Sequence, residues 1–450
     1  MQSLRKLDLG YTNLFASIDS LRGLCELKNL RALYLDSNNL DGRALPPCLS
    51  NLSKLEEMWL SGNDLGSYSS ALTGLKKLWT LNLDSNHLTD DGISPWISNL
   101  KSLTELSLQR NKLKGSDTMR GVCGLSSLRE LYLQDNYLSS LPICMGNFSL
   151  LEKLELSENN LTSLFGNSIS GLKRLQELDL GWNQLTDDGI SPWISNLTSL
   201  AELYLGNNKL KGADTMRGVC GLSSLRELYL HDNYLSSLPI CMGNFSLLEK
   251  LDLSENNLTS LFGNSISGLK RLESLDLGWN HLTDDGISPW ISNLTSLTYL
   301  CLGNNKLKGA DTMRGLKRLE SLDLGWNQLT DDSISPWISN LTSLTYLRLE
   351  NNKLKESDTM RGLKRLQELY LGWNQLTDDS ISPWISNLTS LAELYLGNNK
   401  LKGSDTIRGP GETHGDPVIS CGIYPKYVRI SEIASFEAPD LPKELRISGT

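Results

Sequence analysis

One spacing of leucine and asparagine recurs along most of this chain. The pattern L-x-x-L-x-L begins at Leu4 and returns until Leu391, with Met58 in one of the leucine positions. Asparagine stands three residues after the third leucine in every copy but the first, where Thr12 takes its place. From Thr12 to Asn399 these positions lie 22 to 26 residues apart, in 17 copies. Such regular recurrence predicts similar coils stacked on one another.

The spacing also predicts how each coil folds. Alternate side chains of L-x-L point to opposite faces of a short strand, so the leucines point inward and the x residues outward. The asparagine amide carries donors and acceptors, and it can bond backbone groups that water does not reach. Six buried apolar side chains contribute roughly 12 kcal/mol per coil, whereas ordering about 24 residues costs roughly 36 kcal/mol. Neighbouring coils must therefore supply further burial and the sheet hydrogen bonds.

This pattern is the leucine-rich-repeat signature, L-x-x-L-x-L-x-x-N-x-L. The expected fold is an α/β solenoid of 17 coils over residues 1–409, a horseshoe or superhelix with a parallel sheet on its concave side. Segments such as Leu185–Ile194 place Asp and Thr before an apolar group, which favours short N-capped 3₁₀ or α turns on the convex side. Residues 410–450 follow no repeat and are expected to form a weakly ordered tail.

A longer period is superimposed on the coils. Residues 140–205 and 237–302 are nearly identical at an offset of 97 residues, and a later unit of 47 residues relates Trp326 to Trp373. This indicates internal duplication, so the surface of the solenoid is itself periodic.

The outward positions of each copy, its third, fifth, seventh and eighth residues, form the expected concave surface. They hold 21 acidic residues against five basic ones, although the whole chain has a formal charge of only -9. Aromatic residues lie among these carboxylates, and exposed Trp and Tyr are common interface anchors. We therefore expect this face to bind a protein or peptide segment bearing Lys or Arg. The predicted ligand-binding residues are Trp182, Tyr204, Tyr229, Trp279, Trp326, Tyr370, Trp373, Glu177, Asp179, Glu202, Glu227, Asp276 and Asp323.

A second interpretation of these aromatic residues stays open. Gly-Trp-Asn and Leu-Tyr-Leu are, on this view, neutral copies of a stable coil, with each Trp packed on its neighbours.

Six cysteines fall in consecutive coils at similar heights. The three pairs are Cys25 with Cys48, Cys123 with Cys144, and Cys220 with Cys241. Adjacent coils lie about 5 Å apart, within the Cα separation that a disulfide spans, so these pairs are disulfide candidates if the chain is secreted. Buried free thiols acting as small hydrophobic side chains are the alternative.

Nine N-x-S/T sequons lie outside the strands, where a glycan could project. They are glycosylation candidates if the chain enters the secretory pathway, and simple convex-turn sequence otherwise. The sequon asparagines are Asn51, Asn147, Asn160, Asn196, Asn244, Asn257, Asn293, Asn340 and Asn387.

Several classes of function are not expected. The acidic balance, with pI near 5.2, argues against a nucleic-acid surface. No catalytic constellation, cofactor motif or metal-ligand cluster is visible, and we expect no enzyme activity. The aspartate pairs, such as Asp187 with Asp188, suit helix capping better than calcium binding. No stretch of 18 apolar residues is present, so the sequence predicts no membrane span, and none of the N-terminal residues suggests a secretion signal.

Two cysteine-bearing coils resemble a segment of plant receptor-like proteins, the extracellular leucine-rich-repeat class without a kinase. The segment reads from Gly23 to Leu30 and from Leu45 to Leu52, and it recurs around the other two cysteine pairs. The resemblance implies ligand perception at the cell surface, in signalling or defence, with a co-receptor, at the plasma membrane or outside the cell. We expect the chain to be a fragment lacking a signal peptide and a membrane segment. An intracellular scaffold and an inactive truncated product are the alternatives.

Overall fold

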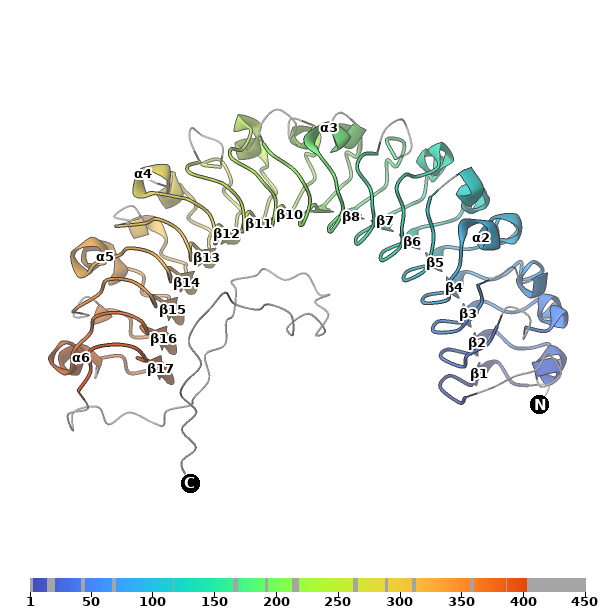
Figure 1. The fold of residues 1–450 in the computed structure, drawn as a ribbon, viewed down its shortest axis with the longest axis horizontal. Coiled ribbons are helices and arrows are strands. Elements are labelled where there is room, and N and C mark those ends of the chain that lie inside the picture. The colour runs from blue at the N-terminus through green and yellow to red at the C-terminus, as the bar shows by residue number, and fades with distance from the viewer. Residues whose placement is uncertain are drawn as a thin grey trace, which may run out of the picture.

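The computed structural model shows a single arch of stacked coils (Figure 1). It describes residues 3–13, 21–41, 45–66, 70–115, 117–164, 169–190, 193–212, 218–261, 266–287, 290–309, 313–356, 360–385 and 387–402. The expected tail, residues 410–450, lies outside the described residues.

Seventeen three-residue strands line the inner side of the arch as one parallel sheet. Each strand pairs with the next in chain order, and the repeat positions stay in register, as when Leu178 faces Leu203. The solenoid with a parallel concave sheet is therefore confirmed. The strands are β1 (Lys6–Asp8), β2 (Ala32–Tyr34), β3 (Glu57–Trp59), β4 (Thr80–Asn82), β5 (Glu105–Ser107), β6 (Glu130–Tyr132), β7 (Lys153–Glu155), β8 (Glu177–Asp179), β9 (Glu202–Tyr204), β10 (Glu227–Tyr229), β11 (Lys250–Asp252), β12 (Ser274–Asp276), β13 (Tyr299–Cys301), β14 (Ser321–Asp323), β15 (Tyr346–Arg348), β16 (Glu368–Tyr370) and β17 (Glu393–Tyr395).

Short helical turns cover the convex side, as the sequence predicts. The described α-helices are α2 (Asp90–Ile97), α3 (Asp187–Ile190), α4 (Asp284–Ile287), α5 (Asp331–Ile338) and α6 (Asp378–Ile385). The described 3₁₀ turns are η1 (Arg22–Glu26), η2 (Pro47–Asn51), η3 (Ser70–Leu72), η4 (Asp117–Gly124), η5 (Ile143–Asn147), η6 (Trp193–Asn196), η7 (Val219–Gly221), η8 (Ile240–Asn244), η9 (Ile291–Asn293) and η10 (Met313–Gly315).

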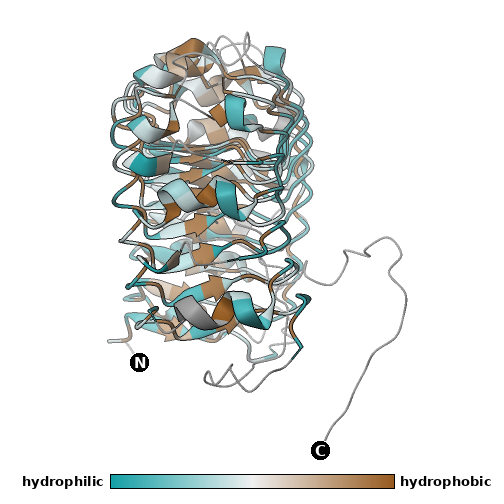
Figure 2. Ribbon diagram, turned by 90° about the vertical axis from the view of Figure 1, so that its left-hand side faces the viewer, coloured by the Kyte–Doolittle hydropathy of each residue, from teal (hydrophilic) through white to brown (hydrophobic). Residues whose placement is uncertain are grey.

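The leucine positions form one continuous core between the sheet and these turns. Leu178, Leu180 and Leu185 of a central coil are fully buried, whereas Leu7 in the first coil and Leu394 in the last are only partly buried. Figure 2 shows hydrophobic residues of successive coils stacked along the solenoid. A coil in the middle buries its leucines because it has a neighbour on each side.

The asparagine column connects each coil to the preceding one. Asn183 donates from Nδ2 to the carbonyl oxygens of Leu156 at 2.9 Å and of Leu180 at 3.1 Å, and its Oδ1 accepts the N–H of Leu161 at 3.0 Å. Equivalent bonds recur along the array, to Asn399. The side chains thus supply buried backbone groups with partners, as the sequence predicts.

Tryptophan and aspartate of the convex segments also hold the coils. Trp193 is buried, and its Nε1–H donates to the carbonyl oxygen of Gly189 at 3.0 Å. The carboxylate of Asp187, at the start of α3, accepts the backbone N–H of Lys211 in the next coil at 2.9 Å. The first aspartate of each convex pair therefore acts between coils, which the expectation of simple helix capping missed.

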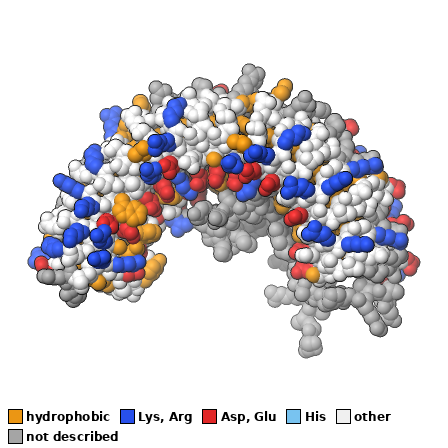
Figure 3. Space-filling view, turned by 180° about the vertical axis from the view of Figure 1, so that it is seen from behind, with side chains coloured by type: hydrophobic (Ala, Val, Ile, Leu, Met, Phe, Trp, Pro, Cys, Tyr) orange, Lys and Arg blue, Asp and Glu red, His pale blue; other side chains and the backbone are white. Residues whose placement is uncertain are grey.

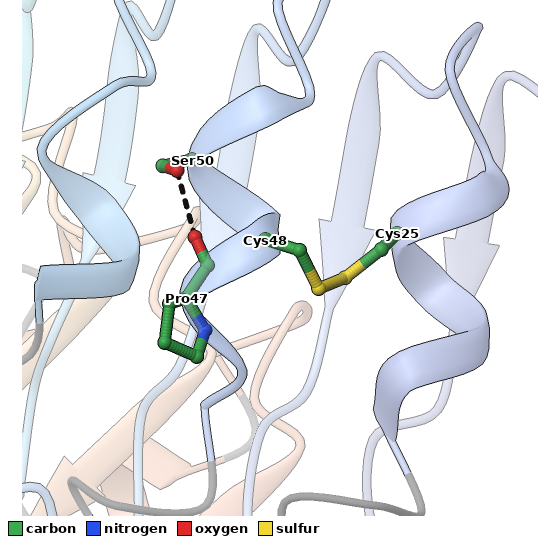
Figure 4. Close-up of a disulfide and its surroundings, with 4 residues drawn as sticks. All are labelled: Cys25, Pro47, Cys48 and Ser50. Atoms are coloured by element: carbon green, nitrogen blue, oxygen red, sulfur yellow. Dashed lines mark hydrogen bonds between the residues drawn. A yellow bond between two sulfur atoms is a disulfide. The ribbon is translucent and has the colours of Figure 1, made fainter.

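Three disulfides join consecutive coils on the convex side. Cys25 bonds to Cys48 across η1 and η2 (Figure 4), with a Cα–Cα separation of 5.6 Å. The other two bonds join Cys123 to Cys144 and Cys220 to Cys241. All three pairs are those that the coil spacing singles out, and the free-thiol alternative does not describe this structure.

Candidate functional site

Four tryptophan side chains stand out from the sheet margin at the eighth position of their repeats. Trp182, Trp279, Trp326 and Trp373 are 54%, 53%, 49% and 55% exposed. The tryptophans of the convex helices, such as Trp337, are buried instead. Tryptophan therefore serves two purposes in this chain. The four tryptophans at the eighth position are not simply packed on neighbouring coils.

Tyrosines at the fifth position form stacked pairs on the sheet. The rings of Tyr204 and Tyr229 lie 4.6 Å apart at an interplanar angle of 6°, and those of Tyr370 and Tyr395 lie 4.3 Å apart. In the repeated Glu-Leu-Tyr strands, the hydroxyl donates to the glutamate two residues earlier, as from Tyr204 to Glu202 at 2.8 Å. Burial, followed by this bond, raises the pKa of the Tyr204 hydroxyl, so it stays protonated and holds the carboxylate in place.

On the face that Figure 3 shows, carboxylates gather at the inner margin of the arch, and Lys and Arg side chains are spread over the flank, some of them beside these carboxylates. Two lysines of the concave strands form ion pairs: Lys153 contacts Glu155 at 2.7 Å and Glu177 at 2.8 Å, and Lys250 contacts Glu227 at 3.0 Å. Other acidic side chains, including Asp232 and Glu255, are exposed. The face therefore keeps an excess of negative charge that favours a basic partner.

Aspartates that end the strands hold part of this charge away from water. Asp179 is half-buried and accepts the N–H of Gly181 at 2.8 Å, while Asp323 is buried beside Arg348. Desolvation raises the pKa of Asp179 to about 6, against the bond from Gly181. It also raises the pKa of Asp323 to about 6, against the attraction of Arg348. The negative charge of the face therefore decreases as the pH falls below neutrality.

A histidine on the same face also has a raised pKa. Burial disfavours the charged ring of His231, but the carboxylate of Asp252, 3.4 Å from Nδ1, outweighs this and raises the pKa of the histidine. Protonation of the ring as the pH falls adds positive charge between two strands of the sheet.

The structure places most predicted ligand-binding residues on the concave sheet with some exposure. Glu177, Glu202 and Glu227 are adjacent on β8, β9 and β10, and all three are half-buried. The remaining partly or largely exposed members are Trp182, Tyr204, Trp279, Trp326, Tyr370, Trp373 and Asp179.

Three predicted ligand-binding residues are buried, and the expectation that they face a ligand is wrong in this respect. Tyr229, Asp276 and Asp323 are 2%, 0% and 5% exposed. Tyr229 is covered by the stacked ring of Tyr204, and the carboxylates of Asp276 and Asp323 turn back to accept backbone N–H groups of the glycines that follow each strand. These side chains shape the surface from beneath.

All nine sequon asparagines are exposed in the structure. Asn196 lies at the end of η6 and Asn244 at the end of η8, both on the convex turns away from the sheet. A glycan on either would leave the concave face open. Among the described residues, no group of three His, Cys, Asp or Glu side chains is arranged to hold a metal ion.

Comparisons with known proteins agree with this architecture. A family model described as "Leucine-rich repeat region" matches residues 203–406, and "Leucine rich repeat" models match residues 126–185, 75–95 and 174–197. A leucine-rich-repeat protein of Leptospira interrogans superposes with a TM-score of 0.71 at 30% identity, covering 89% of this chain and 91% of that one. The chain is a leucine-rich-repeat protein. The leucine-rich-repeat ectodomain of the receptor kinase GASSHO1/SCHENGEN3 from Arabidopsis thaliana also superposes on this chain, with a TM-score of 0.63 at 29% identity, covering 89% of this chain and 48% of that one.

Curated relatives of this leucine-rich-repeat protein come from animals and plants. Keratocan of Danio rerio is 28% identical over 41% of this chain and 44% of its own length. Receptor-like protein 1 of Arabidopsis thaliana is 46% identical over 13% of this chain and 5% of its own length. Lumican of Gallus gallus is 32% identical over 45% of this chain and 50% of its own length. The chain thus spans half or less of the length of these relatives. No described helix has the length and apolar character needed to cross a membrane.

Proposed function

We propose that this leucine-rich-repeat protein is the recognition region of an extracellular receptor-like protein, and that its concave face binds a protein or peptide bearing basic side chains. The observation that carries the proposal is the segregation of side chains in the solenoid. Carboxylates and half-exposed aromatic rings share the concave margin, where the outward positions hold 21 acidic residues and five basic ones. Opposite charge across an interface raises the association rate and selects among partners.

An extracellular location is supported by two chemical features. Three disulfides join consecutive coils, and such bonds persist mainly in oxidising compartments. Nine exposed sequons offer glycosylation sites on a secreted chain. An intracellular scaffold would need neither feature. Glycans at Asn196 or Asn244 on protein purified from its natural tissue would support the extracellular proposal, and unmodified asparagines with reduced cysteines would contradict it.

A role in signalling or defence, together with a co-receptor, completes the proposal. Its support is the resemblance of the cysteine-bearing coils to plant receptor-like proteins and the match to Receptor-like protein 1. The GASSHO1/SCHENGEN3 ectodomain, which shares the fold over most of this chain, was solved in complex with CASPARIAN STRIP INTEGRITY FACTOR 2. Such a role requires that the isolated chain fold and bind, whereas an inactive truncated product would do neither.

The binding test removes the charges of three carboxylates in consecutive coils. Glu202, Asp232 and Glu255 lie on the concave side without an ion pair in the described structure, and Glu202→Gln, Asp232→Asn and Glu255→Gln together remove their charge at little change in shape. A fluorescein-labelled peptide of alternating Lys and Gly serves as the probe, at low and high salt. We expect its affinity for the triple variant to fall about tenfold, at roughly 0.5 kcal/mol for each charge.

The matched control removes the same number of charges from the convex side. Asp188→Asn, Asp285→Asn and Asp332→Asn alter exposed residues of α3, α4 and α5, and the affinity should change less than twofold. Equal losses in the two triple variants, or equal binding of a peptide with Glu in place of Lys, would contradict the concave site.

A further inference from the structure

The eighth position of every repeat has a left-handed backbone. The φ angle there is positive in all 17 coils, from Tyr11 at 56° to Asn398 at 57°. Glycine, asparagine and aspartate tolerate this conformation, and several coils use them, including Gly62, Asp135 and Asn207. Other coils hold larger side chains there, including Arg110 and Glu158, so the geometry of the coil imposes the conformation on every residue type.

Four coils place tryptophan in this position. Trp182, Trp279, Trp326 and Trp373 have φ between 53° and 54°. A bulky residue at positive φ is a real outlier, and it costs on the order of 1 kcal/mol relative to a tolerant residue. Because every coil has this conformation, the backbone does not distinguish these four coils; their half-exposed rings do, since exposed tryptophan is a common interface anchor.

Three of the four tryptophans form a regular ladder. From β12 to β17 the eighth positions alternate between tryptophan and asparagine, in the order Trp279, Asn304, Trp326, Asn351, Trp373 and Asn398. Consecutive strands of a sheet lie about 4.8 Å apart, so successive tryptophans stand two coils, or roughly 9.6 Å, apart. Trp182 is four coils, or roughly 19 Å, from Trp279 and stands outside the ladder.

The indoles are available to a partner. In the described part of the chain, no aromatic ring stacks on Trp279 or Trp373 and no cation lies over them, and neither indole N–H has a hydrogen-bond acceptor. Trp326 differs, since its Nε1–H donates to Glu350 at 3.1 Å. Each rung thus presents an apolar ring, and two of the three present a free donor as well.

We infer that this ladder binds a proline-rich, basic segment in the polyproline II conformation, an inference that rests on the proposed function and names its ligand class. A polyproline II helix advances about 9.3 Å per turn of three residues, which matches the spacing of the rungs. Same-face side chains of an extended strand recur about every 6.8 Å, and two turns of an α-helix advance about 10.8 Å. Either of those ligands would lose register with the tryptophans over two intervals.

The chemistry of the surface fits the same ligand. Proline rings dock on aromatic side chains, and the backbone of a polyproline II segment leaves its carbonyl oxygens without internal partners. The free indole N–H groups and the amides of Asn304 and Asn351 can donate to those oxygens. Lys or Arg side chains between the prolines would meet exposed carboxylates such as Glu255 and Glu393.

The test uses the full chain and the nine-residue peptide (Pro-Pro-Lys)₃, with (Gly-Gly-Lys)₃ as a probe of equal charge. Binding is measured by calorimetry and by tryptophan fluorescence. We expect the proline peptide to bind at least tenfold more tightly. Trp326→Asn introduces the residue that alternate coils carry at this position, so the variant should fold, as far-UV circular dichroism would check. It should weaken proline-peptide binding about tenfold or more, as loss of an interface anchor does.

Trp79→Thr is the matched control. Trp79 is also an exposed tryptophan, at 41%, but it occupies the second position of its repeat, outside the ladder and the concave positions. The next coil carries Thr104 at this position, so the variant should fold and should alter affinity less than twofold. Equal effects of the two substitutions, or equal binding of the two peptides, would overturn the inference. If both peptides bind alike and the concave carboxylate variant weakens both, the ligand class is wrong while the proposed function stands. If neither peptide binds, both fail. Tighter binding of a β-1,4-linked glucose hexamer than of the proline peptide, lost in Trp326→Asn, would assign the ladder to a glycan instead.

Discussion

Replacing a central asparagine of the asparagine column should destabilise the solenoid far more than replacing a terminal one. Asn183 is buried in the eighth coil, whereas Asn399 in the last described coil is partly exposed. Both side chains make the same bonds: Oδ1 accepts a leucine N–H of the preceding coil, and Nδ2 donates to carbonyl oxygens of that coil and its own. The two alanine variants therefore differ mainly in the access of water to the groups left behind.

The size of the effect follows from what each group loses. In Asn183→Ala, the carbonyl oxygens of Leu156 and Leu180 each keep a second donor, from Asn159 and Asn208. The N–H of Leu161 has no other acceptor and stays buried, which costs about 1 to 3 kcal/mol. Lost hydrogen bonds and a small cavity add about 1 kcal/mol. We expect a total of about 3 kcal/mol, against about 1 kcal/mol for Asn399→Ala, where water can replace the amide.

Urea denaturation followed by circular dichroism measures both variants, with hydrogen exchange at the Leu161 amide as a local probe. If the free energy of unfolding of Asn183→Ala falls less steeply with urea concentration, the array opens at the altered coil and no longer unfolds as one unit. The two substitutions could instead destabilise equally, or Asn183→Ala could cost less than about 0.5 kcal/mol. Either result would refute the argument that burial determines how much each asparagine of the column contributes to stability.

Three further outcomes are expected. Replacing Cys123 and Cys144 together by serine should lower stability by about 3 kcal/mol, since the bond closes a loop with a sequence separation of 21 residues; an unchanged melting temperature in the oxidised proteins would contradict this. Trp193→Phe should cost about 1 to 2 kcal/mol, because the buried indole loses its hydrogen bond to Gly189 and the smaller ring leaves a cavity, while the Gly189 carbonyl keeps the N–H of Leu164 as a donor, and urea unfolding would show it. Because folding raises the pKa values of Asp179 and Asp323 to about 6, both carboxylates are favoured in the protonated form, so stability should rise by roughly 1 to 3 kcal/mol from pH 8 to pH 5. The raised pKa of His231 also makes the protein more stable as the pH falls. Asp179→Asn should reduce the difference in stability between pH 8 and pH 5. A fall in stability towards pH 5 would refute the raised pKa values of these carboxylates.

Much of the fold could be predicted because the repeat pattern maps directly onto geometry. The leucine spacing determines which side chains are buried. The recurrence of asparagine at one position indicates the asparagine column, whose hydrogen bonds between coils are seen at Asn183. The cysteine pairs could be predicted for the same reason: stacked coils bring equivalent positions about 5 Å apart. The role of Asp187 could not, because its partner, the N–H of Lys211, belongs to the following coil.

The binding surface was less predictable, since a position in the repeat determines direction but not exposure. Asp179 and Asp276 occupy equivalent places in the duplicated units, yet the first is half-buried and the second is buried. Their neighbours on the next strand differ, with Tyr204 beside the first and Cys301 beside the second. The left-handed backbone at the tryptophans was also invisible in the sequence, where Gly-Trp-Asn gives no sign of the strain at the central residue.

The duplication by whole pairs of coils has a consequence for how such a surface changes over time. Each coil contacts only its immediate neighbours, so gain or loss of a 47-residue unit such as the one relating Trp326 to Trp373 leaves every remaining junction intact. One recombination event would therefore add or remove a complete rung with its spacing already correct. The length of ligand that the surface binds, and with it the avidity, could therefore change in fixed increments, because each added rung repeats contacts that the existing rungs already make.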